Sequence, residues 1–118
     1  MDYAENTISL TELGALELEN ARASKSGRSG NTIYGGHERH LRQTVIALKA
    51  GCGLADHESP GEATLQVLRG NVLLTNAETG TSENLSEGDF ALIPPAVHGV
   101  EAHEDSVLLL TVSLHPHS

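Results

Sequence analysis

The chain has 118 residues, which suits one domain with one modest core. Sixteen acidic residues against seven lysines and arginines give a formal net charge of −9, and only 3% of the residues are aromatic. This charge would repel a phosphate backbone, and the sequence has no interleaved aromatic residues for base stacking, so the composition argues against nucleic-acid binding. The acidic residues are spread along the chain, which indicates a solvated acidic surface around an aliphatic core.

Cys52 is the only cysteine, so no internal disulfide can form. A catalytic thiol would need a base or a positive charge beside it, and the sequence around Cys52 indicates neither. The N-terminal sequence MDYAENTISL lacks a basic region and a long apolar run, and no segment reaches the ~20 apolar residues that span a membrane. We therefore expect a cytoplasmic protein with no membrane contact.

Residues 1–31 are expected to form an N-terminal helix and a linker. Ser9 and Glu12 have capping-box spacing, and apolar residues three to four apart predict a helix from Ser9 to about Lys25. The acidic outer face of this helix would consist of Glu12, Glu17 and Glu19. Residues 24–31 (SKSGRSGN) have the small, polar and glycine-rich composition of a linker. We expect the helix to pack on the outside of a barrel or against a second subunit.

Residues 32–114 predict a β domain, followed by a short tail at 115–118. Runs of β-branched and apolar residues predict strands at Thr32–Tyr34, Leu41–Lys49, Ala63–Arg69, Val72–Thr75, Phe90–Ile93, Gly99–Ala102 and Val107–Leu114. Glycines and prolines mark the turns between these runs. Many short strands with regular turns are typical of a sandwich or a barrel.

Two of the predicted strands are apolar at nearly every position instead of alternating. These are Thr44–Leu48 and Val107–Leu110. A strand that is apolar on both faces must be covered on both faces, whereas one face of a single small barrel would be wet. We therefore predict a homodimer in which sheets pair across the interface.

Two histidines are the main candidates for a functional site. His57 follows an extended segment, and His98 begins a later strand after Pro94-Pro95. On neighbouring antiparallel strands the two side chains can point into one barrel. A metal site needs at least a third donor, and within this part of the chain Glu62 is the obvious additional carboxylate.

The segment Gly51–Gly70 (GCGLADHESPGEATLQVLRG) resembles the first sequence motif of the cupin superfamily. The residues that match this motif in register are Gly51, His57 and Gly70. At the position of the second histidine stands Ser59, and at the position of the glutamate stands Ala63, next to Glu62. Because one residue of offset turns a side chain to the opposite face of a strand, Glu62 could serve only after a local rotation of the backbone.

The segment Gly88–His98 (GDFALIPPAVH) resembles the second cupin motif. Gly88 and Pro94 match it, Ala96 replaces a glycine, and His98 comes one residue early. The resemblance implies an all-β fold, a double-stranded β-helix (jelly-roll) barrel over residues 32–114, with the short helix outside it. It also implies a divalent metal (zinc, nickel, iron or manganese) held by His57 and His98.

Other polar residues are further candidates. His37, Glu38, Arg39 and His40 form a cluster from which one histidine, His37 or His40, could reach the barrel mouth; a solvated strand end is the alternative. Gln43 and Gln66 would contact a ligand only if their sides of the strands face inward. His103 is expected on an acidic surface turn, and His115 and His117 lie in the tail.

Three functions remain open at this point. The first is a metal-binding cupin with an incomplete site, including an enzyme that acts on a small polar metabolite, where the metal would act as a Lewis acid. The second is a metal-free module that binds or senses a small molecule in an apolar pocket with a few polar groups. The third is an interaction role in which the dimer face matters more than the pocket. The cupin superfamily includes several kinds of enzyme and non-enzymes, so the resemblance does not choose among them.

Overall fold

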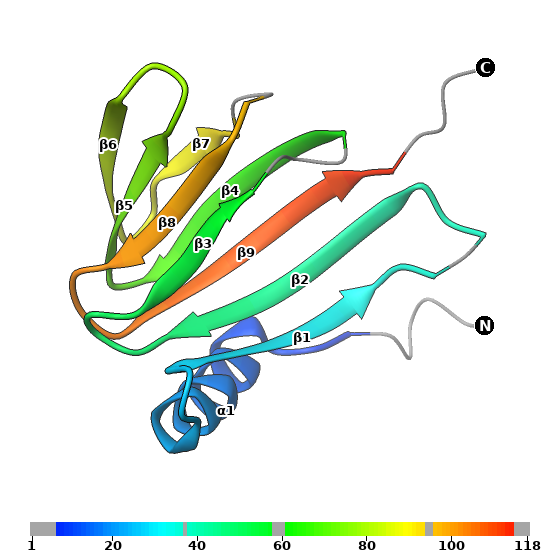
Figure 1. The fold of residues 1–118 in the computed structure, drawn as a ribbon. Helices are drawn as coiled ribbons and strands as arrows, with labels where there is room; N and C mark the ends of the chain where they lie inside the picture. Colours follow the sequence, from blue (N-terminus) through cyan, green and yellow to red (C-terminus); the bar gives the residue numbers. More distant parts are fainter. Residues whose placement is uncertain (1–6, 37, 58–60, 94–95, 115–118) are drawn as a thin grey trace.

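The structure, a computed structural model, describes residues 7–36, 38–57, 61–93 and 96–114. One helix precedes the β-strands (Figure 1). The elements are α1 (Leu10–Ala23), β1 (Arg28–Tyr34), β2 (Leu41–Leu48), β3 (Gly53–His57), β4 (Glu62–Arg69), β5 (Asn71–Asn76), β6 (Thr81–Ser86), β7 (Phe90–Leu92), β8 (His98–Ala102) and β9 (Ser106–Ser113). No helix in these ranges is both long and apolar enough to cross a membrane.

The strands form two antiparallel sheets that pack face to face. The larger sheet has five strands in the order β1-β2-β9-β4-β7, and the smaller has four in the order β3-β8-β5-β6. Strands that follow one another in the chain often belong to different sheets, as β3 and β4 do, which is the connectivity of a jelly roll. The predicted all-β jelly-roll barrel with a short N-terminal helix is confirmed.

An aliphatic core fills the space between the two sheets. Leu65 and Leu108 of the larger sheet are almost completely buried, as is Val72 of the smaller sheet. Along β4, residues alternate between core and outer face: Ala63, Leu65 and Val67 are buried, and the residues between them are more exposed. This period of two fixes which side chains can reach the inside of the barrel.

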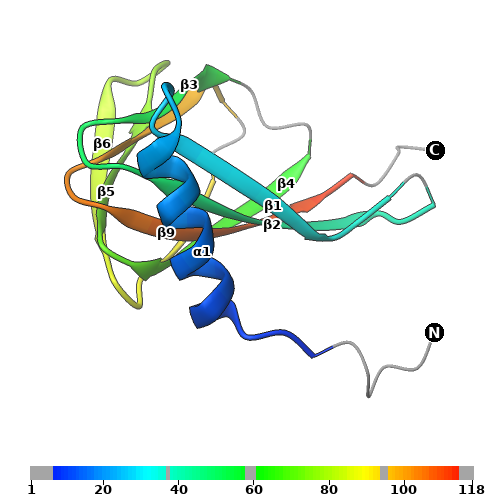
Figure 2. The same cartoon turned by 90° about the horizontal axis from the view of Figure 1, so that it is seen from below.

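Helix α1 lies across the outer face of the larger sheet (Figure 2). Ser9 caps the helix as predicted, because its hydroxyl accepts a hydrogen bond from the Glu12 N–H at 3.1 Å. The expected acidic outer face is wrong for Glu17, which is only 5% exposed and accepts a hydrogen bond from the Ser29 hydroxyl of β1. Glu17 shares the buried side of the helix with Gly14, Leu18 and Ala21.

The helix also covers the strands that are apolar on both faces. Val45 and Ala47 of β2 and Val107 of β9 pack with Leu18 of α1 in a second core outside the barrel. Both faces of these strands are therefore covered within one chain. Their apolar pattern no longer calls for a second subunit, although the homodimer itself stays a prediction.

Three strands depart from the predicted pattern. β3 and β6 have no counterpart among the predicted strands, and β1 begins at Arg28, inside the expected linker. All three are edge strands of their sheets. β6 (TSENLS) is polar, and Leu85 is its one buried residue.

The glycines of the two motif segments occupy backbone conformations that other residues rarely adopt. The φ angles of Gly51, Gly70 and Gly88 are +85°, +93° and +90°. At Gly70 a side chain would also collide with the backbone of the β8–β9 turn, since a Cβ atom there would lie 2.5 Å from the Asp105 carbonyl oxygen. These glycines therefore hold the turns that set the register of the strands.

Candidate functional site

The two motif histidines lie opposite each other on neighbouring strands. In the β3–β8 pair the Cα partner of His57 is His98, after an irregularity between Leu54 and His57. His98 is only 4% exposed, and it lies on the same side of β8 as Val100 and Ala102, which belong to the core. Its backbone position therefore belongs to the inner face of the smaller sheet.

The imidazole of His98 is oriented by its own chain. Its Nδ1 lies 3.0 Å from the carbonyl oxygen of Ala96, and because a carbonyl only accepts, Nδ1 carries the hydrogen. In the neutral ring the lone pair then belongs to Nε2. Histidine ligands of metals are commonly oriented in this way, and so are histidines that accept a hydrogen bond from a ligand.

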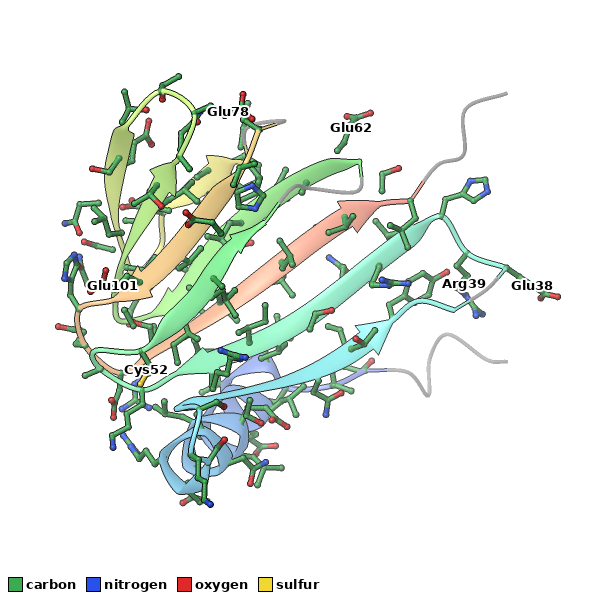
Figure 3. The ribbon with its side chains drawn as sticks, viewed as in Figure 1. Glu38, Arg39, Cys52, Glu62, Glu78 and Glu101 are labelled. Atoms are coloured by element: carbon green, nitrogen blue, oxygen red, sulfur yellow. The ribbon has the colours of Figure 1, made fainter. Side chains whose placement is uncertain are left out.

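The segment before His98 is attached to the turn between β5 and β6. Glu78 accepts a hydrogen bond from the Val97 N–H at 3.0 Å, and the Ala77 N–H donates to the Val97 carbonyl at 2.8 Å. Figure 3 shows Glu78 beside the start of β8. This positioning role was not predicted from the sequence, because the two segments are far apart in the chain and no motif connects them.

Asn76 continues the row that His57 and His98 begin. It is the Cα partner of His98 on the other side of β8, and Thr81 of β6 is in turn its partner. The Asn76 side-chain oxygen accepts hydrogen bonds from the Glu78 and Thr79 N–H groups, so this residue also shapes the turn. The alternation along β5, in which Asn76 follows two core residues at intervals of two, was the sequence signal that could have identified it.

Glu62 does not join His98 inside the barrel. It is the exposed first residue of β4, and Figure 3 shows its side chain at that edge of the sheet. Its neighbour Ala63 is 8% exposed and belongs to the core between the sheets. The interior position on β4 therefore carries a methyl group in place of a carboxylate.

The residues that the structure describes do not make up a complete metal site. Among residues 7–36, 38–57, 61–93 and 96–114, no group of three or more histidines, cysteines, aspartates and glutamates is arranged to hold a metal ion. A catalytic zinc site usually has three protein ligands. Ser59 lies outside the described residues. Among the described residues, His57 and His98 are thus two candidate donors where such a site usually has three.

The remaining candidates lie away from the barrel interior. Glu38 and Arg39 are at the far tip of the β1–β2 hairpin (Figure 3), where the Arg39 guanidinium stacks on the Tyr34 ring at 5.1 Å. His40 is exposed, and its carbonyl accepts a hydrogen bond from the Leu114 N–H. His37 lies outside the described residues, as do His115 and His117 of the tail.

The two glutamine candidates face outward. Gln43 is on the side of β2 that carries Val45, and its amide donates to the Thr111 hydroxyl at 3.2 Å. Gln66 is exposed on the outer face of β4. His103 is exposed on the turn after β8, as predicted, and its N–H donates to the Asn71 carbonyl.

The inner face of the larger sheet adds polar groups beside an apolar floor. Thr44 of β2 shares a face with Ile46 and Leu48, which pack on the core, and its hydroxyl lies 3.2 Å from that of Thr32. Thr44 is also in register with Leu110 of β9. Hydroxyl groups on one sheet and His98 on the other thus border the aliphatic core.

No family model matches the sequence, and no curated protein matches it. The structure is similar to a cupin-2 domain protein from Shewanella frigidimarina, with a TM-score of 0.70 at 13% identity over 95% of this chain and 99% of that one. This chain has the cupin fold. The structure is also similar to that of a conserved protein of unknown function from Streptococcus pyogenes, with a TM-score of 0.68 at 25% identity over 80% of each chain.

An enzyme is also among the structures similar to this cupin-fold chain. A single-residue variant of salicylate 1,2-dioxygenase from Pseudoaminobacter salicylatoxidans gives a TM-score of 0.71 at 20% identity. The match covers 86% of this chain and 34% of the enzyme. At this identity the likeness establishes a shared fold and no activity.

Proposed function

We propose that this cupin-fold protein binds a small polar metabolite in the mouth of its barrel. The observation that supports this most directly is His98, a buried imidazole on the inner face of β8 whose Nδ1 is held by the Ala96 carbonyl. An oriented imidazole is a polar group of the kind that fixes a small ligand in a pocket. Binding sites of this kind combine an apolar wall with a few oriented polar groups.

A divalent metal bound by His57 and His98 is the second candidate. It is favoured by one observation, the direct backbone register of the two histidines across β3 and β8. It is disfavoured by Ala63, which leaves the opposite sheet without a carboxylate at the interior position. A metal held there would need further donors from the bound metabolite or solvent, and when bound it would supply Lewis-acid chemistry.

Two measurements on the same preparations separate these candidates. The untagged chain carries His115→Ala and His117→Ala, so that the tail binds no metal, and is compared with the same chain bearing His57→Ala and His98→Ala. Elemental mass spectrometry measures metal content, and native mass spectrometry detects a co-purified organic molecule. We expect an organic ligand that the His57/His98 variant loses, and little metal in either protein. Stoichiometric metal that disappears in the variant would favour the second candidate.

A gain-of-function variant tests the assignment of the site. Because Ala63 faces the interior, Ala63→Glu together with Ser59→His should supply the two donors that the motif lacks. We expect zinc affinity to rise by at least about 100-fold over the parent chain. Ala63→Glu alone is the matched control and should bind zinc much more weakly. No gain in the double variant would contradict the register on which this site is built.

A further inference from the structure

Large apolar side chains remain exposed on the outer side of the larger sheet. Phe90 and Leu92 flank the core residue Ala91 on β7, so they point to this outer face. Leu41 shares the outer side of β2 with Val45. Leu16 of α1 is also exposed, but it lines a hollow with Asn31 and Ile33 on the β1 side of the helix, away from β7. Leu41, Phe90 and Leu92 are therefore exposed on the same side of the larger sheet.

The helix covers only part of this outer face. It packs on β1, β2 and β9, and a groove of about 440 Å³ separates its first two turns from Leu68 and Arg69 of β4. Beyond the groove, Phe90 is 61% exposed and Leu92 is 73% exposed. Both residues lie on β7, the edge strand of the larger sheet.

Two rows of residues on the part of the face beyond the groove are uncharged, and the next row, Leu41, Ser113 and Glu62, ends in an exposed carboxylate. Both uncharged rows consist of register partners that start on β7 and run across the larger sheet. The first row is Leu92, Thr64, Thr111 and Gln43. The second row is Phe90, Gln66 and Leu109, and it continues to Val45 under the helix. We call the seven residues before Val45 the outer strip. None of them is ionisable, although the chain carries sixteen acidic residues and a net charge of −9. The outer strip therefore offers neither a cation nor an anion to a charged partner.

We propose that the outer strip binds the outer strip of a second copy of this chain, in a two-fold symmetric dimer. Two chains of charge −9 repel each other as a whole, and an isologous contact through the neutral strip avoids direct contact between like charges. Phe90 and Leu92 of the strip and the neighbouring Leu41 are 61%, 73% and 43% exposed, and together they present about 350 Å² if each side chain measures about 200 Å². The threonines, the glutamines and Leu109 between them extend the contact toward the ~800 Å² per partner of a standard interface.

This proposal is independent of the ligand site, because Phe90 and Leu92 point away from the barrel interior. It also differs from the interface suggested by the sequence alone. The residues that suggested pairing, such as Val107, are covered by α1, and the dimer is now placed on residues that α1 leaves exposed.

The test is the solution mass of the full chain by analytical ultracentrifugation at about 10 µM, a concentration at which a micromolar dimer is well populated. We expect twice the 12.5 kDa of one chain. Phe90→Glu with Leu92→Glu should weaken the dimer by more than about 100-fold, because carboxylates would be buried without partners. Ser82→Glu with Asn84→Glu adds the same charge to exposed positions of β6 on the other sheet and should leave the dimer intact.

A second measurement does not depend on any variant. Salt screens the repulsion between two acidic chains, so the dimer of the wild-type chain should become tighter between about 0.05 M and about 0.5 M ionic strength. An interface held by ion pairs would weaken instead. A monomeric wild-type chain overturns the proposal, as does a dimer that Phe90→Glu with Leu92→Glu leaves unchanged or that salt weakens.

Discussion

The contact between β3 and β8 depends on the absence of a side chain at Gly53. A Cβ atom at this position would lie 2.1 Å from the carbonyl oxygen of Val100, about 1 Å closer than such atoms approach one another. The obstacle is backbone, so no side-chain rotation relieves it. β3 is an edge strand whose one neighbour is β8. Gly53→Ala should therefore push β3 away from β8 and disturb the register of His57 with His98.

The size of this effect follows from the hydrogen bonds beside Gly53. The Gly51 N–H donates to the Ala102 carbonyl and the Ala102 N–H donates to the Cys52 carbonyl, each at 2.9 Å. A displacement of about 1 Å would break both bonds, at about 1 kcal/mol each. For a domain of this size, a loss of about 2 kcal/mol lowers the melting temperature by about 8 °C.

Calorimetry and amide hydrogen exchange of Ala102 measure the two consequences of Gly53→Ala. Gly51→Ala is the matched control: no atom lies within 4 Å of the Cβ that it adds, and its cost comes from a φ of +85°. That strain amounts to about 1–2 kcal/mol and should leave the Ala102 N–H protected. A Gly53→Ala variant that melts with the wild type, or whose Ala102 N–H exchanges no faster, would refute this account of the β3–β8 contact.

Three further changes test other parts of the structure. Glu78→Ala removes the acceptor of the Val97 N–H. Exchange of that amide, followed by NMR, should therefore accelerate about fivefold, which corresponds to a loss of about 1 kcal/mol. An unchanged rate would exclude the positioning role of Glu78. The hydrogen bond from the Ala50 N–H lowers the pKa of Asp105, so the ionised form stabilises the fold above the ordinary pKa of aspartate. Asp105→Asn should therefore reduce the free energy of unfolding at pH 7, and the difference from wild type should shrink as the pH falls below about 4; a difference that persists in acid would contradict this. Leu108→Ala, at a fully buried core position, should cost about 2–5 kcal/mol in chemical denaturation, and a cost below about 1 kcal/mol would mean that the core is misassigned.

The interior of this fold could be predicted from sequence far better than its edges. Core strands such as β4 and β9 carry enough apolar residues to be recognised, because both sheets and the helix bury them. The edge strand β6 has a polar sequence with one buried leucine, and its existence depends on pairing with β5. A strand of this kind owes its structure to a neighbour, which local composition does not reveal.

The candidate site was predictable to a similar degree. The motif resemblance predicted His57 and His98 as site residues, which stays a prediction, and the β3–β8 register places their backbones opposite each other. The contribution of Glu78 was not predictable, since it depends on how the β5–β6 turn meets the segment before β8. Glu17 was predicted to be exposed because it is acidic. Its position three residues after Gly14 places it on the buried side of the helix instead.

The motif residues of this chain serve two separable physical purposes. The first purpose is structural and is met by Gly51, Gly70 and Gly88. Their positive φ angles form turns of the barrel, whichever side chains fill its interior. The positions that correspond to metal ligands in the cupin motif have a different purpose, and Ala63 at one of them packs in the core as an ordinary apolar residue. A carboxylate at that position would be costly to bury without a cation, whereas a methyl group adds to the stability of the barrel. The turn glycines are therefore compatible with the loss of the interior carboxylate. For this reason the sequence motifs predict the fold of this chain more reliably than its chemistry.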